Sequence, residues 1–172
     1  MTAKKAYAHL LDISKRHKHR NLHKFLQNSE IISIDARVDT SLSLKYFLIK
    51  RVIGQQVSVK AALSIWLKVK NVLDKTQQPI TIELLKKQGL SKPKAAYIFG
   101  IINNKFIEEA TIAKLKKLSL EDLSHFFLQL KGVGPWTLGV VRMFFIQDTD
   151  VFLEGDLGIN KALENFFNSQ DY

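Results

Sequence analysis

The sequence of 172 residues contains no cysteine. This absence excludes disulfide bonds and any metal or iron–sulfur site that depends on thiolate ligands. Three prolines and eight glycines are too few for a flexible linker or a low-complexity tract. No run of 18 apolar residues is present, and the first residues do not read as a signal or transit peptide. We therefore expect a protein that is not secreted, located in the cytoplasm or nucleoid of a bacterium or the nucleus of a eukaryote.

Acidic residues are also in short supply. Lysine and arginine number 26 against 16 aspartates and glutamates, which gives a net charge of +10. The excess lies early in the chain: residues 1–72 hold fourteen basic residues against four acids, whereas residues 119–172 hold three against eight. This balance favours a polyanionic partner that is attracted mainly by the first part of the chain.

Helical periodicity accounts for most of the chain, with nearly half of the residues apolar. We expect helices over 2–19 and 42–53, a helix that begins after Ser58, and three short helices within 79–118 that begin at Thr81, Ser91 and Thr111. The only candidate strand, at 150–153, is too short to found a sheet. The histidines near the N-terminus lack the spacing of a metal site and predict a solvated basic surface instead; they are His17, His19 and His23.

Two helices joined by a tight turn are predicted between residues 119 and 145. Ser119 is expected to cap the first helix, with Asp122 reaching back to it. Gly132 ends that helix, and Gly134 is expected to supply a second unusual backbone angle. Pro135 suits the first position of the next helix, because its missing N–H would have had no partner there.

The turn itself is a candidate phosphate-binding site. Residues 130–137 read LKGVGPWT, and a Gly-x-Gly turn before a helix presents backbone N–H groups at the positive end of the helix dipole. A lone Gly-x-Gly is also compatible with a helical hairpin in a core. The full string resembles the helix-hairpin-helix DNA-binding motif. The resemblance implies DNA contacts at Lys131, Gly132, Val133, Gly134 and Thr137.

A second string sharpens the resemblance. Residues 150–158 read DVFLEGDLG and resemble the loop that carries the catalytic aspartate in the helix-hairpin-helix DNA glycosylase superfamily, most closely in its 3-methyladenine DNA glycosylase II branch. Asp156 lies twenty residues after Trp136, which is the spacing of that branch. The resemblance covers residues 41–163. It implies an all-α fold with two helical lobes around a cleft, lobe one formed by 1–40 and 147–172 and lobe two by 41–146.

The resemblance assigns catalysis to Asp156. An aspartate before an apolar helix is a favoured N-cap, and capping alone would also explain it. Capping keeps the carboxylate ionised, and a fixed carboxylate can stabilise the positive charge that develops on the sugar when an N-glycosidic bond breaks. Trp136 stands where members that also cut the backbone carry a lysine, so the resemblance implies no lyase activity. Its indole would stack on a cationic base, although packing in the core is an alternative.

A third string, RVIGQQVSVKAA at 51–62, resembles the segment of the same branch that enters the DNA minor groove. By position, Gln56 would fill the space left by the flipped-out base, with Gln55 and Ser58 beside it on the DNA. Ser58 also suits the N-cap of the next helix. An ordinary turn with two exposed glutamines is the alternative.

The chain departs from the family at two points. Val140 occupies a position that is aromatic in some relatives, and the sequence ends before the family's last pair of helices. Two alternatives therefore stay open beside an alkylpurine glycosylase: a catalytically impaired DNA-binding remnant, and a glycosylase for deaminated or oxidised bases. The expected partner is double-stranded DNA with damaged bases, bound by a monomer and not at a membrane. No cofactor or metal is expected, apart from a monovalent cation at hairpin carbonyls near Leu128, Leu130 and Gly132 when DNA is bound.

Overall fold

The computed structural model describes residues 3–31 and 41–167, and within these ranges all regular structure is helical. The predicted all-α class is therefore confirmed, and the candidate strand at 150–153 does not form. The predicted lobe boundary near residue 40 and the end of predicted lobe one lie outside the described residues. None of the described helices is both long enough and apolar enough to cross a membrane.

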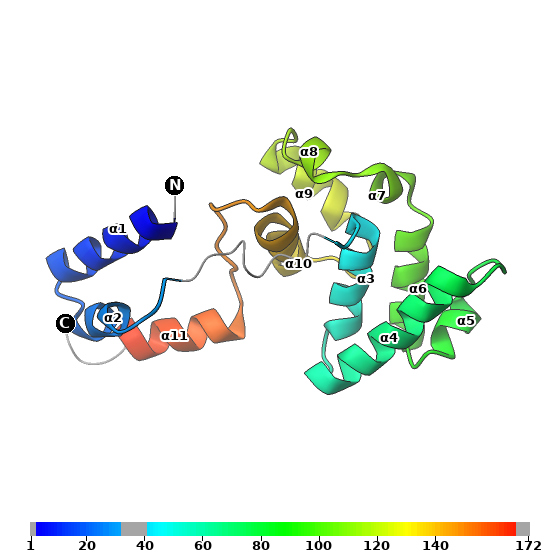
Figure 1. The fold of residues 1–172 in the computed structure, drawn as a ribbon, viewed down its shortest axis with the longest axis horizontal. Helices are drawn as coiled ribbons and strands as arrows, with labels where there is room; N and C mark the ends of the chain where they lie inside the picture. Colours follow the sequence, from blue (N-terminus) through cyan, green and yellow to red (C-terminus); the bar gives the residue numbers. More distant parts are fainter. Residues whose placement is uncertain (1–2, 32–40, 168–172) are drawn as a thin grey trace.

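Three helices lie together at one end of the molecule (Figure 1): α1 (Ala3–Arg16), α2 (Arg20–Gln27) and α11 (Leu157–Phe167). Ring contacts join α2 to α11, with the Phe25 and Phe166 centroids 5.0 Å apart. The predicted single helix over 2–19 is wrong at its end. Lys18 adopts a left-handed φ of 57°, so the chain turns and begins α2, which the sequence reading missed.

The remaining elements form the larger group in Figure 1: α3 (Leu44–Gly54), α4 (Val59–Lys75), α5 (Ile82–Lys86), α6 (Lys92–Ile102), α7 (Lys105–Glu109), α8 (Ile112–Leu115), α9 (Leu120–Leu128), α10 (Pro135–Val141) and the π-helical turn η2 (Arg142–Ile146). Local capping explains most of the starting points. Side chains of Ser58, Thr81 and Ser119 accept hydrogen bonds from the first turns of α4, α5 and α9, as predicted. Residues 79–118 form four helices and not three, because Asn104 caps an additional one, α7.

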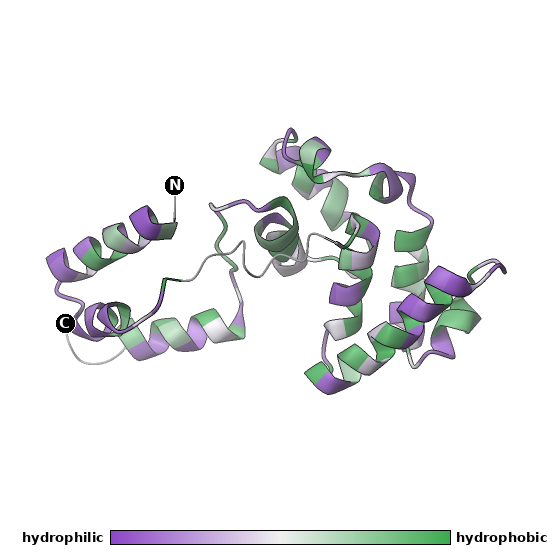
Figure 2. Ribbon diagram, in the orientation of Figure 1, coloured by the Kyte–Doolittle hydropathy of each residue, from purple (hydrophilic) through white to green (hydrophobic). Residues whose placement is uncertain are grey.

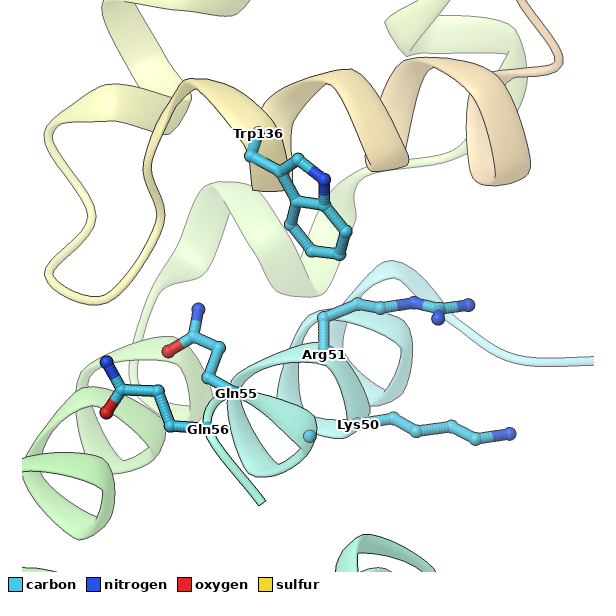
Figure 3. Close-up of a pocket in the computed structure, with 6 residues that line it drawn as sticks. Lys50, Arg51, Gln55, Gln56 and Trp136 are labelled. Carbon is cyan, nitrogen blue, oxygen red and sulfur yellow. The ribbon is translucent and has the colours of Figure 1, made fainter. Parts of the chain in front are cut away.

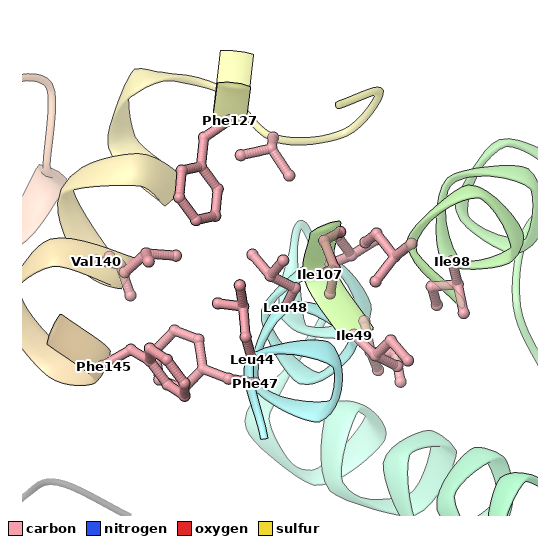
Figure 4. Packing of buried hydrophobic residues seen from close by; sticks show 14 of the residues in the cluster. Leu44, Phe47, Leu48, Ile49, Ile98, Ile107, Phe127, Val140 and Phe145 are labelled. Carbon is pink, nitrogen blue, oxygen red and sulfur yellow. The ribbon is translucent and has the colours of Figure 1, made fainter. Parts of the chain in front are cut away.

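Helix α3 is the centre of the core. It packs against α4, α6 and α7, and six of its eleven residues are buried. Figure 4 shows that Leu44 and Phe47 face Val140 and Phe145 of the α10–η2 segment. A helix that is apolar on most of its circumference must be surrounded by other elements. The turn that follows α3 therefore begins directly after two buried residues of this helix, Val52 and Ile53.

Burial is much lower in the group formed by α1, α2 and α11. No residue of α11 is buried, and Leu26 is the buried residue of α2. Figure 2 shows polar and apolar residues alternating along α11, whereas α10 is apolar for most of its length. The position of α11 therefore depends on a small number of specific contacts more than on a large core.

Candidate active site

The helical hairpin forms between α9 and α10. Ser119 and Asp122 form the reciprocal capping box at the start of α9. Gly132 has a φ of +85°, and a Cβ atom there would lie 2.4 Å from Cδ2 of Tyr97. Gly134 has a φ of −104° and a ψ of −178° as the N-cap of α10. The prediction of a second unusual angle is therefore wrong, because a helix N-cap takes an extended conformation that any residue adopts.

The hairpin offers mainly backbone and Lys131 to a ligand. Lys131 is exposed, and Gly132 and Gly134 are partly exposed. The side chains of Val133 and Thr137, which were predicted to contact DNA, are buried in the core at 5% and 3% exposure. Contact from these two positions must therefore come from backbone atoms. Because Pro135 opens α10, the first helical position has no N–H to present.

Trp136 and Asp156 are brought into direct contact. The indole Nε1 donates to Oδ2 of Asp156 at 2.9 Å. The other carboxylate oxygen, Oδ1, accepts from the backbone N–H groups of Gly158 and Ile159 at 2.9 and 3.0 Å, so Asp156 caps α11 as predicted. The bond from Trp136 is the largest cause of a pKa of Asp156 below its ordinary value, with the Ile159 and Gly158 amides adding to it. Trp136 is 40% exposed, which is more than core packing would leave.

The loop before Asp156 is held by contacts that the sequence reading missed. Arg142 of η2 donates to Oδ2 of Asp148 at 2.9 and 2.6 Å and to the carbonyl of Asp150 at 2.9 Å. Burial alone would raise the pKa of Asp148, but the Asp150 N–H and the Arg142 guanidinium lower it below its usual value. Gly139 lets the loop approach α10, since a Cβ there would lie 2.5 Å from Leu153 Cδ2.

The turn between α3 and α4 is tied to the hairpin. Gln55 donates from Nε2 to the carbonyl of Gly132 at 2.9 Å, so this amide, predicted to contact DNA, is engaged within the protein. Lys94 of α6 donates from Nζ to the carbonyls of Ile53, at 2.8 Å, and Gln55. Gln56 is exposed and has a left-handed φ of 56°. The side chain of Ser58 caps α4, with its Oγ 3.3 Å from the Ala61 nitrogen.

A cavity of about 450 Å³ lies between this turn and α10. Its lining consists of Lys50, Arg51, Gly54, Gln55, Gln56 and Trp136. Figure 3 shows Trp136 reaching down from α10 towards the end of α3, with Gln55 and Gln56 on one side and the Arg51 and Lys50 side chains extending to the other. The cavity is therefore lined by one aromatic, two basic and two amide side chains, and its aromatic member is the residue that binds Asp156.

No group of three or more His, Asp or Glu side chains in the described ranges could hold a metal ion. At the hairpin, the Leu130 carbonyl accepts from Val133 N–H at 3.0 Å and the Gly132 carbonyl accepts from Gln55. Each carbonyl has a second lone pair, so neutral oxygen ligands for a monovalent cation fit this turn.

Comparison with known proteins gives relatives of one kind. No family model matches the chain. It is 32% identical over 129 residues to DNA-3-methyladenine glycosylase 1 of Schizosaccharomyces pombe, a match that covers 67% of this chain and 54% of that protein. It is 23% identical over 167 residues to DNA-3-methyladenine glycosylase of Saccharomyces cerevisiae, covering 87% of this chain and 56% of that protein. The chain thus spans about half the length of these two relatives.

The fold is shared with a solved structure. The crystal structure of DNA-3-methyladenine glycosidase from Bacillus halodurans superposes with a TM-score of 0.72 at 20% identity, over 94% of this chain and 73% of that chain. The chain therefore has the all-α helix-hairpin-helix DNA glycosylase fold, as predicted.

Proposed function

We propose that the chain belongs to the 3-methyladenine DNA glycosylase II branch of the helix-hairpin-helix superfamily and hydrolyses the N-glycosidic bond of alkylated purines in duplex DNA. The hydrogen bond between Trp136 Nε1 and Asp156 Oδ2, at 2.9 Å, carries this proposal. It places an ionised carboxylate and an aromatic face together at the start of α11, in a fold shared with such an enzyme.

Asp156 supplies the negative charge for the reaction. When the bond between C1′ and the base nitrogen breaks, positive charge develops on the sugar, as in glycoside hydrolysis. The indole N–H and two backbone amides fix the carboxylate and keep its pKa low, so it is an anion at neutral pH. A carboxylate fixed in advance stabilises this charge without reorganisation and can orient the attacking water.

Trp136 supplies a stacking surface for the base. Its half-exposed indole faces the cavity, and a cationic base over an indole gains about 0.5–2 kcal/mol. The absence of an amine at this position argues for a monofunctional enzyme, because a lyase needs an amine to form a Schiff base with the sugar.

The two turns bind the duplex in this proposal. The hairpin from Lys131 to Gly134 holds a phosphate through backbone groups, together with a monovalent cation on its carbonyls. Gln56 occupies the space left by the flipped base, since it is exposed at the tip of a turn that Gln55 and Lys94 hold in place. One monomer is expected to bind one lesion.

The experiment that tests this function measures base release from methylated duplex DNA by the chain and by Asp156→Asn. Asparagine is also a favoured N-cap, so α11 should stay folded. We expect the variant to lose about a hundredfold or more in rate and to bind DNA as before. Asp150→Asn removes the same charge from the same loop and should keep full activity.

The outcomes separate the three readings of the sequence. DNA binding without base release by the unaltered chain would favour an inactive DNA-binding protein. Release of only deaminated or oxidised bases from a lesion panel would favour a different substrate. Equal loss in Asp156→Asn and Asp150→Asn would show that the carboxylate of Asp156 has no particular role.

A further inference from the structure

A second cavity, of about 250 Å³, lies at the turn between α1 and α2, and its lining is strongly basic. The lining residues of this α1–α2 cavity are Ser14, Lys15, Lys18, Arg20 and His23. No acidic side chain lines it, and none of the ion pairs within the described ranges includes its lysines or its arginine. Like charges that converge without a counterion repel one another. The cavity is therefore suited to an anion from outside the protein.

The imidazole of His23 is oriented by a buried serine. Ser14 is 1% exposed, and its Oγ lies 2.8 Å from the carbonyl oxygen of Leu11 and 2.9 Å from Nδ1 of His23. A carbonyl can only accept, so the single hydroxyl proton is donated to Leu11, and Oγ accepts from the Nδ1–H of His23. In a neutral imidazole the other nitrogen, Nε2, then has no proton. Only the protonated ring can donate from Nε2 to an anion.

The surroundings of His23 contain no competing acid. The charged groups that face it are the three cations of the lining. Asp12, the acid of α1, forms an ion pair within that helix and lies outside the lining. Helix α11, which contacts α2 through aromatic rings, contributes no residue to the cavity. A bound anion favours the protonated ring, so binding of an anion and protonation of His23 are coupled.

The lining matches the chemistry of a DNA backbone phosphate. Lysine and arginine are the side chains that neutralise these phosphates in protein–DNA interfaces. The α1–α2 cavity offers three such side chains, together with a histidine that can donate when protonated. A phosphate contact carries no sequence information. It would therefore strengthen binding to any duplex and leave the choice of lesion to the cavity beside Trp136.

The position of the α1–α2 cavity suits a duplex bound at the candidate active site. Helix α11 begins directly after Asp156 and ends at Phe167, whose ring centre lies 4.9 Å from that of His19 (Figure 1). Eleven helical residues span about 16 Å, which equals about five base pairs of duplex. We propose that the α1–α2 cavity binds a backbone phosphate of the duplex that carries the lesion, and that His23 binds it in protonated form. The inference rests on the proposed function only for the position of the lesion.

The test measures the Kd for a duplex with a stable abasic analogue at its centre, which the protein cannot cut. Lys18 has a left-handed φ of 57°, so Lys18→Gly removes a charge without a loss of thermal stability. The double variant combines it with Arg20→Met, and its Kd should rise about tenfold. The slope of log K against log salt should become less steep by about 0.9, the value for one phosphate. Lys4→Met with Lys24→Met removes two exposed charges outside the lining of the cavity and is the matched control.

Two further measurements connect the loss of affinity to the phosphate. The unaltered chain should bind DNA more tightly at about pH 6 than at about pH 8. His23→Asn, whose amide can still donate to Ser14, should lose this difference. Shortening one of the two duplex arms to about three base pairs, too short to reach the cavity, should abolish the difference between the double variant and the unaltered chain. The rate of base release at saturating DNA should be the same in all variants, because none of these residues touches the base.

Other results overturn the inference. Equal weakening by the double variant and its control would mean that the charges act only at long range, and a difference that survives shortening of either arm would exclude the phosphate contact. Inorganic phosphate that shifts the His23 resonances, without any loss of DNA affinity in the double variant, would show a site for free phosphate instead. DNA binding with all the expected changes but without base release would refute the proposed function alone. If Lys18→Gly lowers thermal stability, Lys18→Asn replaces it, because asparagine also tolerates the left-handed conformation.

Discussion

Replacing the two hairpin glycines by alanine should have very different consequences. Gly132 has a φ of +85°, and an added Cβ would meet Cδ2, Cγ and Cβ of Tyr97 at 2.4, 2.9 and 3.2 Å. A left-handed conformation costs a residue other than glycine roughly 1–2 kcal/mol. Overpacking costs about 1–3 kcal/mol more, because the clashing atoms include the base of the Tyr97 side chain, which cannot swing aside alone. We expect Gly132→Ala to lower the free energy of unfolding by about 2–5 kcal/mol.

Gly134→Ala is the matched control within the same turn. Gly134 has an extended backbone with no atom within 4 Å of an added Cβ. Alanine is a poorer N-cap than glycine, so the expected loss is below about 1 kcal/mol. Urea unfolding followed by circular dichroism measures both, and the midpoint of Gly132→Ala should fall by roughly 1–3 M for typical slopes. Similar losses for the two variants would refute the reasoning from backbone angle and the Tyr97 contact.

Two further predictions concern the proposed site. Gln56→Gly should change the free energy of unfolding by less than about 1 kcal/mol, because relief of the left-handed φ offsets the entropy of glycine. Base release should slow about tenfold on duplex but not on single-stranded DNA. Equal slowing on both would contradict the proposal that Gln56 fills the space left by the flipped base. Trp136→Phe removes the main cause of the low pKa of Asp156, so that pKa should rise towards its ordinary value. The ionised carboxylate stabilises the folded state above this ordinary value, and the contribution is lost as the pH falls through the lower folded pKa. In the variant, the loss of this stability and the acid limb of the pH profile of base release should both move to higher pH. Unfolding and single-turnover rates measured over a pH series would detect the two shifts. An unmoved acid limb would count against Asp156 as the catalytic anion.

Local signals in the sequence predicted the features that depend on a few neighbouring residues. The caps at Ser58, Thr81 and Ser119 form because a hydroxyl accepts from the N–H group three residues later. The same logic correctly predicted that Asp156 caps α11. It missed α2 and α7, whose starts depend on a left-handed Lys18 and on an asparagine that was not recognised as a cap.

Contacts between distant segments could not be predicted in this way. Gln55 and Gly132 are 77 residues apart, and nothing in the sequence shows that this amide points to the hairpin and not to DNA. Lys94 also donates to the carbonyls of Ile53 and Gln55 at the end of α3, which lie 41 and 39 residues earlier in the chain. The burial of Thr137 likewise depends on how α10 faces the core. Side-chain direction at such positions is set by tertiary packing, which periodicity alone does not determine.

These long-range contacts also show how the carboxylate obtains a fixed position. Asp156 precedes a helix without buried residues, so packing of α11 contributes little to its placement. The loop before it is fixed at two earlier points, through Arg142 with Asp148 and through Leu153 against Gly139. The bond from Trp136 is the contact that acts on the carboxylate itself. Trp136 lies in the first turn of α10, and Val140 of that helix faces Leu44 and Phe47 of α3 (Figure 4). A small displacement of a catalytic group can cost about a hundredfold in rate. The indole therefore ties the carboxylate at the start of α11 to α10, a helix whose residues are largely buried. Its loss should reduce activity even on a base that does not stack on it.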